Sequence, residues 1–256
     1  MDNKLQIFAF EHILAAGAVN CVSTRKGGVS TGVYQSMNLW HTYGDDPANV
    51  DENFRIICHA LGFDMDKRVF SQQTHGTNIV AVDSDTEILT NVDGLLTNVE
   101  GIVLTTYFAD CVPLFFYDPF NKVIGNAHAG WRGCAENMAG KMVDKMVEWY
   151  GCQPSNILAG IGPSISVKHF QVDQDVADKF KIALPFSEKF VYNSQDVHGK
   201  FFVDLWQICQ ESLVLAGLRP ENIEIAGLCT YENKDLFFSH RRDGLPRGSM
   251  VGMISL

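Results

Sequence analysis

Residues 102–117 read IVLTTYFADCVPLFFY, and this stretch decides the fold class that the sequence predicts. It contains two almost continuous apolar runs, 102–108 and 112–117, which are separated by Ala109, Asp110 and Cys111. Short apolar runs of this kind are typical of strands that are covered on both faces. Each run is far shorter than the roughly 20 apolar residues that a membrane-spanning helix needs. The stretch therefore predicts two buried strands with a turn between them.

Further strands and helices surround this stretch. Strands are expected at 18–24, 68–71, 78–82, 123–127, 157–161, 223–228 and 250–255, and helices at 46–61, 133–150, 172–182 and 204–216. Strands that cluster in the middle, with helices on the flanks, indicate an α/β (α+β) fold built as a mixed-sheet sandwich, more than a doubly wound dinucleotide-binding fold. No motif of the G-x-G-x-x-G type between a strand and a helix, and none of the G-x-x-x-x-G-K-[ST] type, supports nucleotide binding.

Composition and charge exclude several classes of protein. Hydrophobic residues make up 46% of the 256 and charged residues 20%, which is enough apolar material for a substantial core. No linker or repeat divides the chain, so we expect a single domain over residues 1–256. The net charge of −10 argues against nucleic acid as a partner. No membrane span and no secretory leader is evident, so we expect a cytoplasmic protein, whose oligomeric state stays open.

Three short motifs carry residues that bind metals. QQTHG (72–76), ADCVP (109–113) and HAGWRG (128–133) each follow or end an expected strand, where ligand sites collect in mixed sheets. Their His75, Cys111 and His128 offer the imidazole and thiolate groups that suit Zn²⁺. Three protein ligands leave one position open for water, as in catalytic zinc sites. The competing interpretation is that each residue is simply packed or capped at a strand end, as single His and Cys residues there usually are.

The seven cysteines give no sign of a second kind of site. Their number is odd, their spacing is irregular, and no C-x-x-C pair occurs. This pattern argues against a disulfide framework and against a zinc ribbon. Most of the cysteines are therefore expected to be small buried side chains.

A further group of motifs is suited to an anion. STRKGGVS (23–30) offers backbone N–H groups and small hydroxyls, and SHRR (239–242) offers guanidinium forks for phosphate or carboxylate. The cations of this group are Arg25, Lys26, Arg241, Arg242 and Arg247. Singly, each cluster is more often a solvated turn or a salt bridge, but together they predict a phosphate pocket. Asn38 is a candidate for holding a polar edge of the substrate, or for capping a turn.

The order of these motifs resembles that of a known family. STRKGGVSTGVY, QQTHG, ADCVPLFFYD, HAGWRG, GIGPSI and SHRRDG follow one another between about residues 23 and 245. This series is similar to that of the YfiH/YlmD proteins, bacterial relatives of human FAMIN that are also called laccase-domain or polyphenol oxidase proteins. One position departs from the pattern, since Gln171 stands where many relatives carry Glu. Glutamine is uncharged, so a role that depends on a carboxylate at that position is not implied for this chain.

The resemblance implies both a fold and an activity. The fold is a four-layer α/β/β/α sandwich with mixed sheets, and the metal is zinc on His75, Cys111 and His128. The activity is phosphorolysis of purine nucleosides (adenosine, inosine and methylthioadenosine), in which phosphate attacks the anomeric carbon of the ribose. Adenosine deamination and a link to peptidoglycan editing are also implied. The partners are thus purine nucleosides and phosphate, with no nucleic acid and no membrane.

Individual residues fit roles in that chemistry. Asp110, beside Cys111, is a candidate proton shuttle or a partner that orients a histidine. Arg25, Arg241 and Arg242 are candidates for holding phosphate or stabilising its transition state.

Three alternative functions stay open. Copper binds most nitrogen and sulfur sites more tightly than zinc, so the chain can be a copper-loaded polyphenol oxidase, although it has only eight histidines and no His-x-His pair. It can be a metal-free hydrolase with Cys111 as nucleophile and His75 or His128 as base. It can also be a binding protein with a vestigial site.

Overall fold

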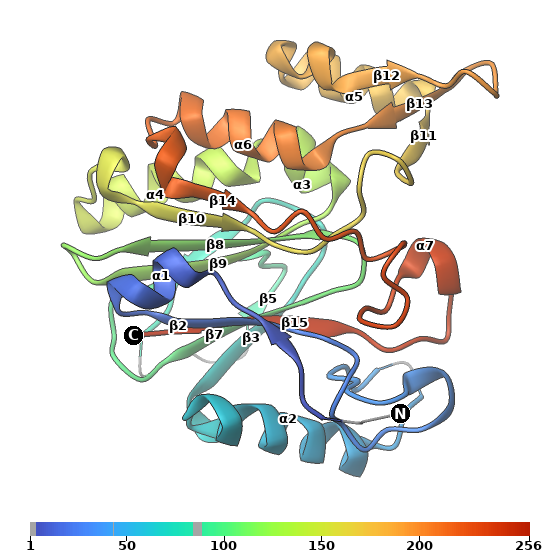
Figure 1. The fold of residues 1–256 in the computed structure, drawn as a ribbon. Coiled ribbons are helices and arrows are strands. Elements are labelled where there is room, and N and C mark those ends of the chain that lie inside the picture. The colour runs from blue at the N-terminus through green and yellow to red at the C-terminus, as the bar shows by residue number, and fades with distance from the viewer. Residues whose placement is uncertain (1–3, 43, 84–88) are drawn as a thin grey trace.

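Two mixed β-sheets lie face to face between layers of helices in the computed structural model, which describes residues 4–42, 44–83 and 89–256 (Figure 1). The first sheet, in spatial order, consists of β1 (Ile7–Phe8), β2 (Val19–Ser23), β15 (Met250–Ser255), β7 (Val103–Phe108), β3 (Arg68–Gln72) and β5 (Leu89–Thr90). The second consists of β14 (Ile223–Ile225), β10 (Leu158–Ile161), β8 (Val112–Asp118), β9 (Val123–Ala129), β6 (Gly94–Thr97) and β4 (Ile79–Ala81).

Helices cover the outer face of each sheet, which confirms the four-layer α/β/β/α sandwich (Figure 1). The first sheet is covered by α2 (Pro47–Leu61), and the second by α3 (Trp131–Ala135), α4 (Met138–Tyr150) and α6 (Leu205–Leu215). The remaining helices are α1 (Glu11–Ala16), α5 (Gln174–Ala183) and α7 (His240–Asp243). A small sheet of β11 (Gln171–Asp173), β13 (Lys200–Val203) and β12 (Val191–Asn193) lies beside α5 at one end of the sandwich (Figure 1). Within the described ranges, no helix is long and apolar enough to cross a membrane.

Hydrophobic clusters fill the three spaces between the layers. Leu104 and Phe115 belong to the cluster between the sheets, Phe116 and Met142 to the cluster beneath α4, and Phe54 to the cluster beneath α2. Every residue of β7 and β8 is buried, which confirms the prediction made from residues 102–117. Successive side chains of a strand point to opposite faces, so β8 contributes Phe115 to one core and Phe116 to the next.

One predicted helix is confirmed and another is wrong. At the start of α2, the Asp46 side chain accepts the backbone N–H of Ala48 at 3.0 Å, and Gly62 ends the helix at φ 71°. The single helix expected at 133–150 is instead two helices, α3 and α4. Asn137 separates them, because its backbone is left-handed (φ 63°) and its side chain accepts the N–H of Gly140 at 3.2 Å as the cap of α4. The first of the two helices, α3, begins at Trp131, within the HAGWRG motif that carries His128.

Candidate metal centre and active site

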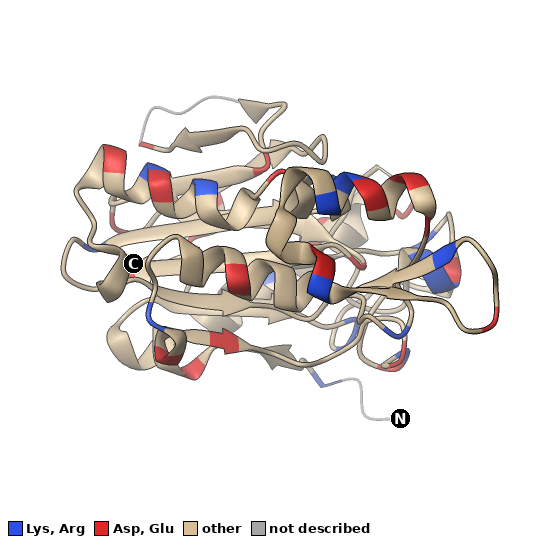
Figure 2. Cartoon of the chain, turned by 90° about the horizontal axis from the view of Figure 1, so that it is seen from above, with Lys and Arg blue, Asp and Glu red and all other residues tan. Residues whose placement is uncertain are grey.

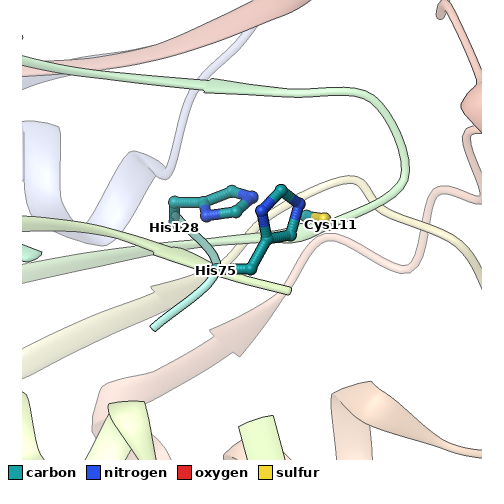
Figure 3. Close-up of side chains that lie close together, drawn as sticks. All are labelled: His75, Cys111 and His128. Atoms are coloured by element: carbon teal, nitrogen blue, oxygen red, sulfur yellow. The ribbon is translucent and has the colours of Figure 1, made fainter. Parts of the chain in front are cut away.

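The pairing of β8 with β9 brings Cys111 and His128 together. In this antiparallel pair Pro113 lies opposite His128, so Cys111, just before β8, lies beside the end of β9. His75 reaches the same point from the loop after β3 (Figure 3). The ligand atoms of the three side chains all lie within 4.8 Å of one another. Residues that are far apart in the sequence thus converge in the way that the sequence predicts.

Asp93 fixes both histidines. Its Oδ1 lies 2.8 Å from Nδ1 of His128 and accepts the backbone N–H of His75 at 3.0 Å. Its Oδ2 accepts the N–H groups of Thr74 and Gly76 at 3.1 and 2.9 Å. This fully buried carboxylate therefore shapes the 74–76 loop and turns Nε2 of His128 away from itself. A carboxylate behind a ligating imidazole is the usual outer partner in metal sites.

The site is built tightly around a glycine. His75 has a left-handed backbone (φ 62°), and its ring lies 4.8 Å from that of His128 with the planes at 87°. A Cβ at Gly130 would lie 2.7 Å from Cδ2 of His75 and 3.4 Å from Sγ of Cys111. The φ of Gly130 is −64°, which any residue adopts, so space rather than backbone conformation requires glycine here.

The electrostatics of the cluster favour a thiolate. Burial opposes ionisation of Cys111, but the charge and hydrogen bonds of His128 and His75 outweigh it and lower the pKa of the thiol to about 6. Burial likewise opposes protonation of His128, yet Cys111 and the Asp93 hydrogen bond raise the pKa of its imidazole to about 9. Burial also disfavours the charge on Asp93, but its bond to His128 holds the pKa of this carboxyl below the usual value. A thiolate and two imidazoles are a donor set that fits Zn²⁺.

A cavity of about 450 Å³ opens beside the three side chains, large enough for a small ligand. Its apolar walls include the aromatic residues Trp40, Tyr107, Phe108, Trp131 and Phe170. Its arginines are Arg132, Arg241 and Arg247, and its histidines are His240 and the two of the cluster. The cavity thus combines aromatic rings with three guanidinium groups, in a chain whose net charge is −10 and whose acidic and basic residues are intermixed along the helices (Figure 2).

Asp110 lines this cavity, but its carboxylate bonds to groups other than a histidine, so the predicted role of orienting a histidine is wrong. Its carboxylate accepts the hydroxyls of Thr230 and Ser239 at 2.6 and 3.0 Å and the backbone N–H of Arg241 at 2.6 Å. Three donors from distant segments therefore hold Asp110. The expected position behind a histidine belongs to Asp93, which sequence reasoning missed. An Asp followed by Gly94 looks like an ordinary turn, and no local signal marks it.

Two of the predicted anion-binding arginines, Arg25 and Arg242, bind other groups of the protein outside the cavity. Nε and Nη1 of Arg25 donate to the carbonyls of Gln35 and Lys234, and the guanidinium lies 4.5 Å from the centre of the Phe238 ring. Arg242 donates to the carbonyls of Thr230, Tyr231 and Phe237 and to Asp243. Neither these arginines nor Lys26 belongs to the described residues that line the cavity.

Asn38 likewise has a structural position. Its amide nitrogen donates to the carbonyl of Trp40 and to Asp45, and its oxygen accepts the N–H groups of Trp40 and Ser249. It is almost fully buried. The turn-capping interpretation of Asn38 therefore fits the structure, and the substrate-holding one does not.

Arg241 is the predicted phosphate ligand that does line the cavity. Its Nη1 donates to the carbonyls of His169 and Gln171, both at 3.0 Å, which hold the side chain against the wall. Gln171 thus contributes its backbone carbonyl here. Arg247 lines the cavity too, with Nη1 donating to the Gly248 carbonyl and to the Ser249 hydroxyl, both at 2.8 Å.

Comparisons with known proteins place this site in a family. Residues 19–256 match the family model described as multi-copper polyphenol oxidoreductase laccase. The chain is also 37% identical over 243 residues to the purine nucleoside phosphorylase YlmD of Bacillus subtilis (strain 168), with 91% of this chain and 87% of that protein covered. The chain belongs to this laccase family.

Solved structures of similar chains share the architecture. YlmD from Geobacillus stearothermophilus superposes with a TM-score of 0.87 at 35% identity, covering 94% of this chain and 92% of that one. YfiH from Bacillus licheniformis gives a TM-score of 0.92 at 32% identity, with both chains covered completely. The laccase family model spans His75, Cys111 and His128, so the whole candidate site lies inside the matched region.

Proposed function

We propose that the chain is a purine nucleoside phosphorylase that holds a zinc ion on His75, Cys111 and His128. One observation carries the proposal: the three ligand side chains converge at the edge of a cavity that also presents aromatic rings and arginines. The names of the similar YlmD and YfiH proteins support the same activity. We include adenosine, inosine and methylthioadenosine as substrates, and deamination of adenosine as a side activity.

The cavity residues divide between the two substrates. Trp40, Tyr107 and Trp131 offer rings against which a purine can stack. Arg241 and Arg247 offer guanidinium groups, whose N–H donors match the oxygens of a phosphate ion. We assign the phosphate to these two arginines, in place of Arg25, Arg242 and Lys26.

In phosphorolysis, the arginines and the aromatic residues of the cavity have separate tasks. Phosphate attacks the anomeric carbon of the ribose, the bond to the base breaks, and the base leaves with the bonding electron pair. The arginines orient the anion and balance its charge, and the aromatic walls exclude water that would otherwise compete with phosphate. A bound zinc ion would supply Lewis acidity that polarises a substrate atom.

His240 is the cavity residue best suited to pass a proton. Burial and the neighbouring Arg247 lower the pKa of its imidazole, so the ring is neutral near pH 7. Nε of Arg247 lies 3.4 Å from its Nδ1, which is the geometry of a long, weak hydrogen bond. A ring that accepts at Nδ1 carries its proton on Nε2 and is a donor there.

Product analysis tests the proposal. Purified protein of measured zinc content is incubated with adenosine, with and without phosphate. Adenine and ribose 1-phosphate that form only with phosphate are the expected result. Inosine formed without phosphate shows deamination. Absence of turnover at full zinc loading would remove the proposed function and leave a binding role.

A second function is favoured by the low pKa of Cys111. A thiolate beside an imidazolium is also the arrangement of cysteine hydrolases. That function predicts activity in the presence of a chelator, whereas the zinc-dependent one predicts loss on chelation and recovery with Zn²⁺. Loading the same apoprotein with Cu²⁺ and assaying a phenol tests the copper oxidase that the family description names.

A further inference from the structure

A second cluster of ligand-type side chains lies outside the set of residues that line the cavity. His169, Cys229 and Glu232 place one ligand atom each within 4.8 Å of the other two. In the described parts of the chain, this cluster and the His75 cluster are the two groups of three such residues. The proposed function uses the His75 cluster as its metal site. It gives no role to the cluster of His169, Cys229 and Glu232.

The backbone around the second cluster is fixed by several contacts. Ser164 forms an isolated parallel β-bridge with Cys229, its N–H donates to the Leu228 carbonyl, and its own carbonyl accepts the N–H of Thr230. Asn233 donates to the Cys229 carbonyl through both its backbone N–H and its side chain. The two segments that supply the three side chains are therefore held in register without any metal.

The side chains themselves are already oriented toward one another. Nε2 of His169 lies 3.0 Å from Oε1 of Glu232, and its ring stacks on Tyr231 with centroids 4.3 Å apart. Sγ of Cys229 accepts the N–H of Ser166 at 3.3 Å and is buried. Lys168, whose Nζ lies 3.9 Å from Oε1 of Glu232, is exposed and at the limit of ion pairing.

We propose that His169, Cys229 and Glu232 form a second binding site for a zinc-class divalent cation. Imidazole, thiolate and carboxylate are the three donor types that Zn²⁺ accepts, with bonds of about 2.0–2.3 Å. Ligand atoms on a tetrahedral ion of that size lie roughly 3.3–3.8 Å apart, so shifts of about 1 Å complete the site. Binding displaces the Cys229 proton to solvent, and the proton shared between Nε2 of His169 and Glu232 moves to Nδ1 of the same ring. Two metal bonds then replace the hydrogen bond between His169 and Glu232.

The position of this site gives it a structural role. The carbonyl of His169 is one of the two that hold Arg241 against the cavity wall. Thr230, next to Cys229, donates its hydroxyl to Asp110. A cation that joins His169 to Cys229 therefore ties together the two segments that carry these contacts.

Cadmium titration tests the second site independently of the first. Cd²⁺ bound by thiolate absorbs in the ultraviolet, so a Cys111→Ser apoprotein reports only on the remaining cysteines. We expect the absorbance to saturate at one equivalent of Cd²⁺ and to disappear in the Cys111→Ser, Cys229→Ser double variant. Circular dichroism checks that both variants are folded. Because Cys111 is absent throughout, the result does not depend on the proposed enzymatic function.

Two of the ligands, His169 and Glu232, lie at least partly at the surface and provide variants that leave the core intact. In the Cys111→Ser background, His169→Gln and Glu232→Gln should each weaken Cd²⁺ binding at least about tenfold. The matched control is His12→Gln, because His12 pairs with Glu224 at 2.7 Å, and that pair is not part of either three-residue cluster. Absence of thiolate absorbance in Cys111→Ser, its persistence without Cys229, or an affinity unchanged by both Gln variants would each overturn the second site.

Discussion

The carboxylate of Asp93 lies 2.8 Å from Nδ1 of His128, and both side chains are buried. The same carboxylate holds the backbone of the 74–76 loop, so one residue sets the positions of two of the three candidate metal ligands. Asp93 is therefore a positioning residue, whose effect should appear in metal affinity before it appears in catalysis.

Asp93→Asn should weaken zinc binding about 10- to 100-fold, because it removes the charge that orients His128 and favours binding. Competition with a chromophoric chelator measures this affinity. The control is Asp118→Asn, which alters a buried carboxylate at the opposite end of β8 from Cys111. Equal losses of affinity in both variants would show that Asp93 acts only through general stability.

Gly130→Ala should displace His75, because the new Cβ would lie 2.7 Å from its ring. We expect loss of zinc and of phosphorolysis with the fold retained, as measured by metal content and circular dichroism. Gly76→Ala is the control, since a Cβ there meets its nearest atoms only at 3.7 Å. Normal zinc content in Gly130→Ala would show that the 74–76 loop moves enough to accept the new Cβ without loss of the metal.

Zinc affinity should keep rising between pH 7 and about pH 9. A raised pKa of about 9 means that His128 of the apoprotein holds its proton up to that pH, and zinc must displace it. The Cys111 thiol, with its pKa of about 6, adds a second displaced proton only below that pH. Chelator competition from pH 5 to 9.5 measures the curve. A plateau at pH 7, where an ordinary histidine is already neutral, would contradict the assignment.

Arg241→Gln should raise the KM for phosphate about tenfold or more, since it removes a charged donor from the cavity. The KM for adenosine should change much less. Arg25→Gln is the matched control, and it should leave the phosphate KM nearly unchanged because its guanidinium donates to Gln35 and Lys234 outside the cavity. If Arg25→Gln raised the phosphate KM and Arg241→Gln did not, the result would support Arg25 as the phosphate ligand, as the sequence predicts.

The sequence correctly predicts those helices and strands whose bounds depend on residues close together in the chain. α2 begins and ends where Asp46, Pro47 and Gly62 indicate, and β8 lies where its apolar run indicates. The three ligands were identifiable because each belongs to a distinctive motif at the end of a strand, although spacing alone does not show that they meet. Their convergence depends on the β8–β9 register, which is a long-range property.

What the sequence does not predict depends on partners that are distant in the chain. Arg25 carries the charge that a phosphate ligand needs, but one of its acceptors, Lys234, is 209 residues away. Asp110 is likewise occupied by donors more than 100 residues further on. The helix break at Asn137 is the local exception, where a left-handed residue interrupts an otherwise regular apolar spacing. Charge and residue type show what a side chain can bind, and only the fold shows what it does bind.

The alignment of two neighbouring strands also determines whether the three proposed metal ligands can meet. Pro113 faces His128 across the β8–β9 ladder, and a slip of one residue would turn His128 toward the other side of the sheet. A hairpin with this shifted register would place the imidazole of His128 and the Sγ atom of Cys111 on opposite faces of the sheet. Its affinity for zinc would therefore be low. A zinc ion bound as proposed would therefore stabilise the correct register over the shifted one, because only the correct register offers it all three ligands.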